Sequence, residues 1–183
     1  MTMTVQTSEA ARGIERLEMR APAATDGADA YRLVHEHGGL DRNSAYAYVL
    51  GFDEFGATSL IARDQVAGVL AGFILGLSPP RRPESLFVWQ IGVAPDYRGT
   101  GLGGRMLDAL VQRVGPRFLE ATVTPSNAAS HALFRAFARR HGVEAALHPA
   151  YAAHDFPGGH EAEDRYRIGP LSAERSTLGG LEP

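Results

Sequence analysis

The sequence predicts an α/β (α+β) fold, because strand-like and helix-like segments follow one another within a single domain. Residues 86–93 alternate bulky and β-branched side chains, which is typical of a buried strand. Residues 102–114 instead place apolar side chains at helical spacing. A glycine-rich turn over residues 98–104 joins these two segments. The central strand is therefore expected to lead through glycines directly into a helix.

The other elements are expected on both sides of this central unit. Before this unit, a strand is expected over 15–20, followed by a helix that is capped by Thr25 or Asp26 and ends near Gly38 and Gly39. A second helix is expected to start at Asn43 or Ser44. Segments 58–63 and 66–77 are then expected to form a hairpin joined by Asp64 and Gln65. After the central unit come a strand over 118–123, a helix from about 126 to 141, a short strand over 144–147 and a last strand over 165–168. The order indicates one sheet with helices packed against it.

Length and composition limit the classes of protein that remain. A chain of 183 residues with 44% hydrophobic and 21% charged residues suits one domain, expected over 15–170, with disordered ends over 1–14 and 171–183. The net charge of −3 gives no general attraction to nucleic acid. Without cysteine there is no disulfide framework, thiolate metal site or cysteine nucleophile, and no metal is expected. No apolar stretch is long enough for a membrane span, so a cytoplasmic protein is expected.

The glycine-rich turn is predicted to bind an anion. Glycines allow positive φ and close approach of the backbone, and a helix start offers unpaired N–H groups, so a pyrophosphate would suit residues 98–104. A P-loop would need Lys and then Ser or Thr after Gly104, where this chain has Arg and Met. The glycines also match the dinucleotide pattern G-x-G-x-x-G, with Glu120 as the distant acid. That hypothesis is disfavoured because residues 94–98 separate strand from glycine and Glu120 lies inside a predicted strand.

The run Arg98-Gly99-Thr100-Gly101-Leu102-Gly103 resembles the acyl-CoA pyrophosphate loop of the GCN5-related N-acetyltransferases (GNAT), and the order of elements resembles their fold. The resemblance implies a mixed, mostly antiparallel sheet that splays at the central strand to admit the pantetheine arm, with acetyl-CoA as co-substrate. The residues that it assigns to the cofactor are Ile91, Gly92, Val93, Arg98, Gly99, Thr100, Gly101, Leu102, Gly103, Gly104, Asn127 and Phe134. The central strand is expected to bulge around 91–93 and free an N–H group, and Asn127 could equally be a helix cap.

Four separated strings make a narrower resemblance. The strings LDRNSAYAY (40–48), LFVWQIGVAP (86–95), LEATVTPSNAASHALFRAFARRHG (119–142) and FPGGHEAEDRYRIGP (156–170) are similar to those of the diaminobutyrate acetyltransferases of ectoine biosynthesis. The likeness extends from about residue 17 to 170. It implies transfer of acetyl from acetyl-CoA to the 4-amino group of L-2,4-diaminobutyrate by a homodimer.

Candidate substrate residues follow from the charges of that molecule, which has two ammonium groups and one carboxylate. Asp41 and Glu161 are candidate ammonium partners, although either could be a cap or a surface charge. Trp89 could form a cation–π wall or be part of the core. Tyr46 and His160 could position the amine or pass on its proton. Arg81 and Arg82 remain open as carboxylate ligands or surface charges.

One position departs from the wider GNAT pattern. Where many members have a tyrosine that protonates the leaving thiolate, this chain has Phe134, which has no proton to give. Either another group or water protonates the CoA thiolate, or the thiolate leaves unprotonated. The second course is feasible near neutral pH because a thiol with a pKa of about 8.5 is a stable leaving group. Two alternatives stay open: an acetyltransferase acting on another small diamine or amino acid, and an acyl-CoA-binding module without turnover.

Overall fold

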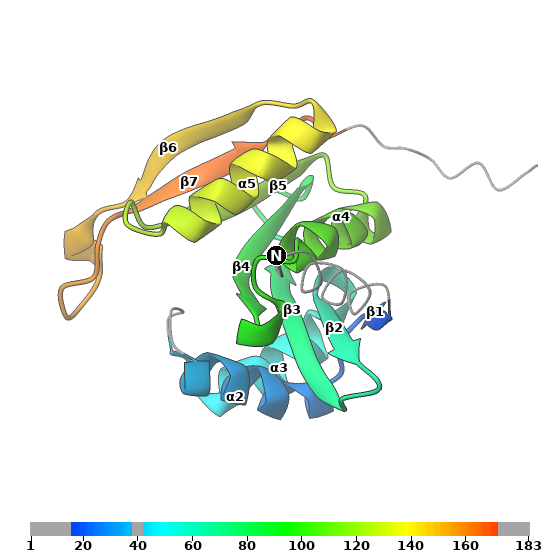
Figure 1. The fold of residues 1–183 in the computed structure, drawn as a ribbon. Helices are drawn as coiled ribbons and strands as arrows, with labels where there is room; N and C mark the ends of the chain where they lie inside the picture. The colour runs from blue at the N-terminus through cyan, green and yellow to red at the C-terminus, as the bar shows by residue number, and fades with distance from the viewer. Residues whose placement is uncertain (1–15, 38–41, 172–183) are drawn as a thin grey trace, which may run out of the picture.

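The computed structural model describes residues 16–37 and 42–171 (Figure 1). The strands are β1 (Leu17–Arg20), β2 (Leu60–Asp64), β3 (Val69–Leu77), β4 (Ser85–Val93), β5 (Phe118–Val123), β6 (Ala145–Tyr151) and β7 (Glu163–Ile168). The helices are α2 (Gly27–His37), α3 (Ala45–Glu54), α4 (Leu102–Val114) and α5 (Ala128–His141). Short 3-10 turns are η1 (Ala24–Asp26), η2 (Gly56–Thr58), η3 (Pro95–Tyr97) and η4 (Ala153–Asp155).

All seven strands form one sheet in the order β1-β2-β3-β4-β5-β7-β6. Every neighbouring pair is antiparallel except β4 and β5, which run parallel. Side chains of α2 and α3 bury one face of β2 and β3, while α4 and α5 bury the opposite face along β2 to β7. Figure 1 shows α2 and α3 together beside β3, with α5 lying along β5 and β7. The expected mixed, mostly antiparallel sheet with flanking helices is confirmed.

The sheet opens between its two parallel strands. Residues 85–88 of β4 pair with residues 118–121 of β5, and the pairing of the two strands ends there. The end of β5 is paired only with β7. On its other side β4 pairs with β3, where Gln90 is opposite Leu75 and Val88 is opposite the next residue, Gly76. Trp89 of β4 therefore has no partner in β3 and is an extra residue in the strand. Such a bulge bends its strand away from the plane of the sheet. The predicted splay is therefore present, with its bulge at Trp89 rather than over 91–93.

The hairpin turn differs from the sequence prediction. Residues 65–68 form it, not Asp64 and Gln65 alone, and β3 begins at Val69. The Asp64 carboxylate accepts hydrogen bonds from the N–H groups of Val66 and Ala67 at 2.9 Å, and Gly68 adopts a φ of 69°. A side chain that bonds its own turn was not visible in the strand pattern.

The other ends of helices and strands lie closer to the positions predicted from the sequence. Ser44 caps α3 by accepting from the Ala47 N–H, and Gly142 ends α5 in the left-handed conformation, as their residue types indicated. Strands β6 and β7 are longer than predicted and begin or end inside the glycine-containing loop. The Leu171 side chain is buried in the core, one residue beyond the expected end of the domain. Within the described parts of the chain no helix is long and apolar enough to cross a membrane.

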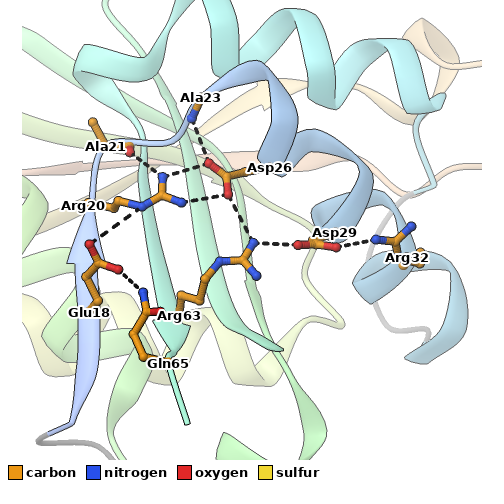
Figure 2. Close-up of polar contacts among 9 residues, drawn as sticks. All are labelled: Glu18, Arg20, Ala21, Ala23, Asp26, Asp29, Arg32, Arg63 and Gln65. Atoms are coloured by element: carbon orange, nitrogen blue, oxygen red, sulfur yellow. Dashed lines mark hydrogen bonds and ion pairs between the residues drawn. The ribbon is translucent and has the colours of Figure 1, made fainter. Parts of the chain in front are cut away.

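An ion-pair network ties α2 to the edge of the sheet (Figure 2). Asp26, whose side chain is 6% exposed, accepts from Arg20 at 2.8 and 2.9 Å and from Arg63 at 3.1 Å. Arg63 also bonds Asp29 at 2.6 Å, and the Ala23 N–H donates to Asp26 at 2.9 Å. Burial alone would raise the pKa of Asp26, but these donors outweigh it and the pKa lies below its usual range. Asp26 therefore contributes stability above the pKa of an unfolded aspartate and loses it as pH falls through its folded pKa.

Asp26→Asn should lower the free energy of unfolding by about 3 kcal/mol, because it leaves Arg20 and Arg63 without their shared buried partner. Urea unfolding at neutral pH measures this. The matched control is Asp108→Asn, which breaks a solvent-exposed pair with Arg140 and should cost below about 1 kcal/mol. Equal losses in the two variants would contradict a stabilising role for the network.

Candidate active site

The glycine-rich turn forms an anion cradle at the start of α4. Gly99 and Gly101 have φ values of 74° and 84°, which side-chain-bearing residues rarely adopt, and a Cβ at either would point into open space. Gly101 is the N-cap of α4, so the N–H groups of residues 102–104 lack acceptors within the helix. These groups and the helix dipole together favour a bound anion. The geometry fits the pyrophosphate expected at this turn.

The hairpin between β2 and β3 supports this cradle. The Tyr97 hydroxyl donates to the Asp64 carboxylate at 2.8 Å, and the Thr100 hydroxyl donates to the Tyr97 carbonyl oxygen at 2.5 Å. Burial, and then the neighbouring Asp64 carboxylate, raises the pKa of Tyr97 to about 12. The phenol therefore keeps its donated proton across the physiological range. Arg98 folds back, with its Nε donating to the Val93 carbonyl oxygen at 3.1 Å.

A cavity of about 780 Å³ lies where β4 and β5 part. Its walls come from the end of β4, the end of β5, the first turns of α5 and the segment around β6 and β7. The residues that line it are Phe87, Val88, Trp89, Gln90, Ile91, Ala121, Thr122, Val123, Thr124, Ser126, Asn127, Ala128, Ala129, Ser130, Phe134, Tyr151, Phe156 and Glu163. The sheet therefore provides an opening wide enough for a small molecule at its own splay.

The backbone of β4 presents N–H groups to this opening. Ala94 donates to the Ala71 carbonyl oxygen of β3 at 2.9 Å. Because antiparallel residues alternate between facing and turning away from their partner strand, Ile91 and Val93 direct their N–H groups away from β3. Strand β5 does not pair with this part of β4. The N–H groups of Ile91 and Val93 can therefore polarise a carbonyl placed in the splay, whereas that of Gly92 faces β3.

The buried Gln90 fixes the bulge from the other side of the sheet. Its Oε1 accepts from the Tyr48 hydroxyl of α3 at 2.8 Å, and both side chains are buried. A buried hydrogen bond of this kind holds the bulged strand against the helix layer. The sequence signal for this contact is a Gln inside an otherwise apolar strand.

The first turn of α5 brings two predicted residues to the cavity. The Asn127 side chain accepts from the Ser130 N–H at 3.0 Å as the N-cap, and it also lines the cavity. The two interpretations of Asn127 are thus compatible. Phe134 is buried, lines the cavity and packs on the Tyr166 ring at 5.6 Å between centroids. It gives the cavity an apolar wall.

The opposite wall carries aromatic and charged groups. Trp89 is 42% exposed and lines the cavity, so it is not part of the core. The His160 ring stacks on Phe156 at 4.3 Å, and its Nδ1 lies 2.6 Å from the Glu161 carbonyl oxygen. Since a carbonyl oxygen only accepts, Nδ1 carries the hydrogen and Nε2 is the nitrogen that can take up a proton. That Nε2 lies 3.7 Å from the Glu163 carboxylate.

Several predicted residues lie elsewhere. Tyr46 is 69% exposed on α3 and does not line the cavity. Glu161 is exposed and accepts from the Ser126 hydroxyl, while Glu163, which the sequence did not single out, lines the cavity. Arg82 pairs with the buried Glu120 at 2.8 Å, so its charge has a partner inside the fold, which is neither of the two roles considered for it. Asp41 lies outside the described residues.

No group of three or more His, Asp or Glu side chains that could hold a metal ion occurs within residues 16–37 and 42–171. In the described part of the chain the cavity offers the backbone N–H groups of β4 and the Glu163 carboxylate, and the His160 ring, which does not itself line the cavity, stacks on the lining residue Phe156. These suit the binding of an acyl thioester beside an amine.

Comparison with known proteins agrees with this geometry. The model of the acetyltransferase (GNAT) family matches residues 17–138. An L-2,4-diaminobutyric acid acetyltransferase of Streptomyces coelicolor is 43% identical over 162 residues, covering 86% of this chain and 95% of that protein. The protein of the same name from Nocardia farcinica is 40% identical over 159 residues, covering 85% and 81%.

Solved structures give the same answer. The diaminobutyrate acetyltransferase of Paenibacillus lautus, in complex with its substrate L-2,4-diaminobutyric acid and coenzyme A, has a TM-score of 0.80 at 39% identity, covering 87% of this chain and 98% of that one. A phosphinothricin acetyltransferase of Sinorhizobium meliloti, 22% identical with a TM-score of 0.63 over 91% and 96%, shares the fold. The chain belongs to the GNAT acetyltransferases and, within them, to the L-2,4-diaminobutyric acid acetyltransferases.

Proposed function

We propose that the chain transfers the acetyl group of acetyl-CoA to the 4-amino group of L-2,4-diaminobutyrate, giving the N4-acetyl product and CoA in ectoine biosynthesis. The observation that carries this proposal is the relative solved with diaminobutyric acid and coenzyme A, which matches 87% of this chain with a TM-score of 0.80. The cavity and the glycine cradle support it independently.

The cofactor is proposed to enter between β4 and β5. Its pyrophosphate would bind the N–H groups of residues 99–104, beside Arg98, and its pantetheine arm would run along Asn127 and Phe134. The thioester carbonyl would accept from the N–H groups of Ile91 and Val93. Such donors stabilise the negative charge that develops on the carbonyl oxygen during acyl transfer.

The amine must lose a proton before it attacks. His160 is the proposed acceptor through Nε2, directly or through water. Trp89 would form a wall that contacts the ammonium group, and Glu163 in the cavity, together with Asp41, is the proposed carboxylate partner of the substrate's positive charges. The nitrogen then bonds to the acetyl carbon and gives up its second proton to water, the carbon–sulfur bond breaks, and the thiolate leaves. Because Phe134 cannot donate a proton, the thiolate departs unprotonated or takes one from water.

A homodimer and a cytoplasmic location complete the proposal. Both come from the resemblance to the diaminobutyrate acetyltransferases and from the composition of the chain. Gel filtration with light scattering tests the dimer directly.

A thiol-release assay tests the function. With acetyl-CoA and diaminobutyrate the protein should release CoA, and NMR of the product should place the acetyl group on the 4-nitrogen. Ornithine and lysine serve as matched substrates, and diaminobutyrate should have the highest kcat/KM. Equal rates on all three would favour a broader amine acetyltransferase, and tight acetyl-CoA binding without CoA release would favour a non-catalytic module.

A further inference from the structure

Arg165 lies beside the cavity on the face of the sheet opposite α5. In the register of β5 and β7 it is the partner of Thr122, a residue that lines the cavity. Successive residues of a strand point to opposite faces, and its neighbour Tyr166 is buried in the core formed with α5. Arg165 therefore shares its face with Thr122 and with Glu163, two residues earlier on β7.

The Arg165 guanidinium is held by aromatic residues that also line the cavity. Its central carbon lies 5.9 Å from the Phe87 ring and 5.7 Å from the Tyr151 ring, and its Nη2 donates to the Tyr151 hydroxyl at 3.1 Å. Planar guanidinium groups stack on aromatic faces in this way and keep their edge donors available. Phe87 and Tyr151, which line the cavity, thus hold a positive charge directly behind its wall.

The charge of Arg165 has no carboxylate partner among residues 16–37 and 42–171, although Arg20, Arg63, Arg82 and Arg167 all have one. Its Nε is also buried and has no hydrogen-bond acceptor in the same residues. A buried charged donor without an acceptor is unfavourable, and it is the arrangement expected of a group whose acceptor arrives with a ligand.

We propose that Arg165 binds the carboxylate of the amino-acid substrate and thereby makes the enzyme select an amino acid over a simple diamine. This inference rests on the proposed function. Glu163 and Arg165 lie about 7 Å apart along one face of β7, at 3.3 Å per residue. Side chains of opposite charge on neighbouring positions of one strand face suit a short molecule that carries an ammonium group and a carboxylate. The Nη groups of Arg165 offer charged donors for that carboxylate.

The test compares diaminobutyrate with 1,3-diaminopropane, which is the same molecule without its carboxylate. Arg165→Met keeps the aliphatic stem that packs on Phe87 and Tyr151 but removes the charge. It should lower kcat/KM for diaminobutyrate by about tenfold or more and leave kcat/KM for 1,3-diaminopropane within about twofold. Arg165→Lys should restore part of the preference. The readout is the ratio of the kcat/KM values for the two substrates. A smaller amount of folded enzyme lowers both values equally and leaves this ratio unchanged.

The control is Arg135→Met on the exposed surface of α5, which should change neither substrate. If Arg165→Met lowers both substrates equally, or keeps the wild-type preference, Arg165 does not bind the carboxylate. Equal wild-type rates on the two substrates would also overturn the inference while leaving amine acetylation intact. A wild-type enzyme that acetylates neither would instead overturn the proposed function and, with it, the substrate assigned to Arg165.

Discussion

Gly101→Asp is expected to raise the KM for acetyl-CoA by more than about tenfold, the effect of losing about 1.4 kcal/mol of binding. The variant places a carboxylate at the N-cap of α4, where the N–H groups of the cradle would meet the pyrophosphate. Like charges then repel, and the new side chain also has to adopt a φ of 84°, which costs about 1 kcal/mol of stability. Titration calorimetry with CoA measures the binding, and kcat at saturating acetyl-CoA should change much less.

Gly115→Asp is the matched control for that variant. Gly115 has a φ of 65° and open space around its Cβ position, so an aspartate there introduces comparable strain and the same charge. It stands at the other end of α4, about 20 Å away at 1.5 Å per residue. Both variants should therefore lose similar stability, but only Gly101→Asp should lose acetyl-CoA affinity. Equal affinities for CoA would mean that the glycine cradle binds no phosphate.

The unit from β4 to α4 could be predicted from the sequence because its signals are local. Alternation ends at Val93, glycines follow, and helical spacing starts at Leu102, so strand, turn and helix each carry their own pattern. The cap residues Ser44 and Asn127 were equally visible, because capping depends on a residue type beside the first helical turn.

The location of the bulge could not be predicted in the same way. An extra residue in β4 depends on how β3 and β4 pair, and the pairing places Trp89, not residues 91–93, outside the ladder. The hairpin turn was misplaced for a related reason, since Asp64 ends β2 by bonding the N–H groups of Val66 and Ala67. Both features depend on partners rather than on local preference.

The substrate side of the site was the part least accessible to sequence patterns. Strand β7 begins at Glu163, two residues before the predicted start at Arg165, so the alternation of Glu163, Arg165 and Arg167 on one face was not recognised. The sequence instead indicates Glu161, which lies just before that strand, as an ammonium partner. A shift of two residues in a strand boundary therefore decides which carboxylate faces the cavity.

Glu163→Gln is accordingly expected to lower kcat/KM for diaminobutyrate by about tenfold or more. The Glu163 side chain is 15% exposed, lines the cavity and lies 3.7 Å from Nε2 of His160, so its charge is only weakly screened by water. An ammonium group that enters the cavity loses hydration, and one charge-assisted hydrogen bond is worth about 1.5–3 kcal/mol in return. Binding of CoA should stay nearly unchanged, because the cradle lies on α4.

Glu161→Gln is the control that separates the two neighbouring acids. Its carboxylate is exposed and accepts from the Ser126 hydroxyl, which can also donate to a glutamine oxygen, so kcat/KM should stay within about threefold of wild type. Steady-state kinetics with diaminobutyrate at saturating acetyl-CoA give both values. A larger loss in Glu161→Gln than in Glu163→Gln would return the ammonium site to Glu161. If neither variant lost activity, the positive charge of the substrate would have to be neutralised by other carboxylates, of which Asp41 is the predicted one.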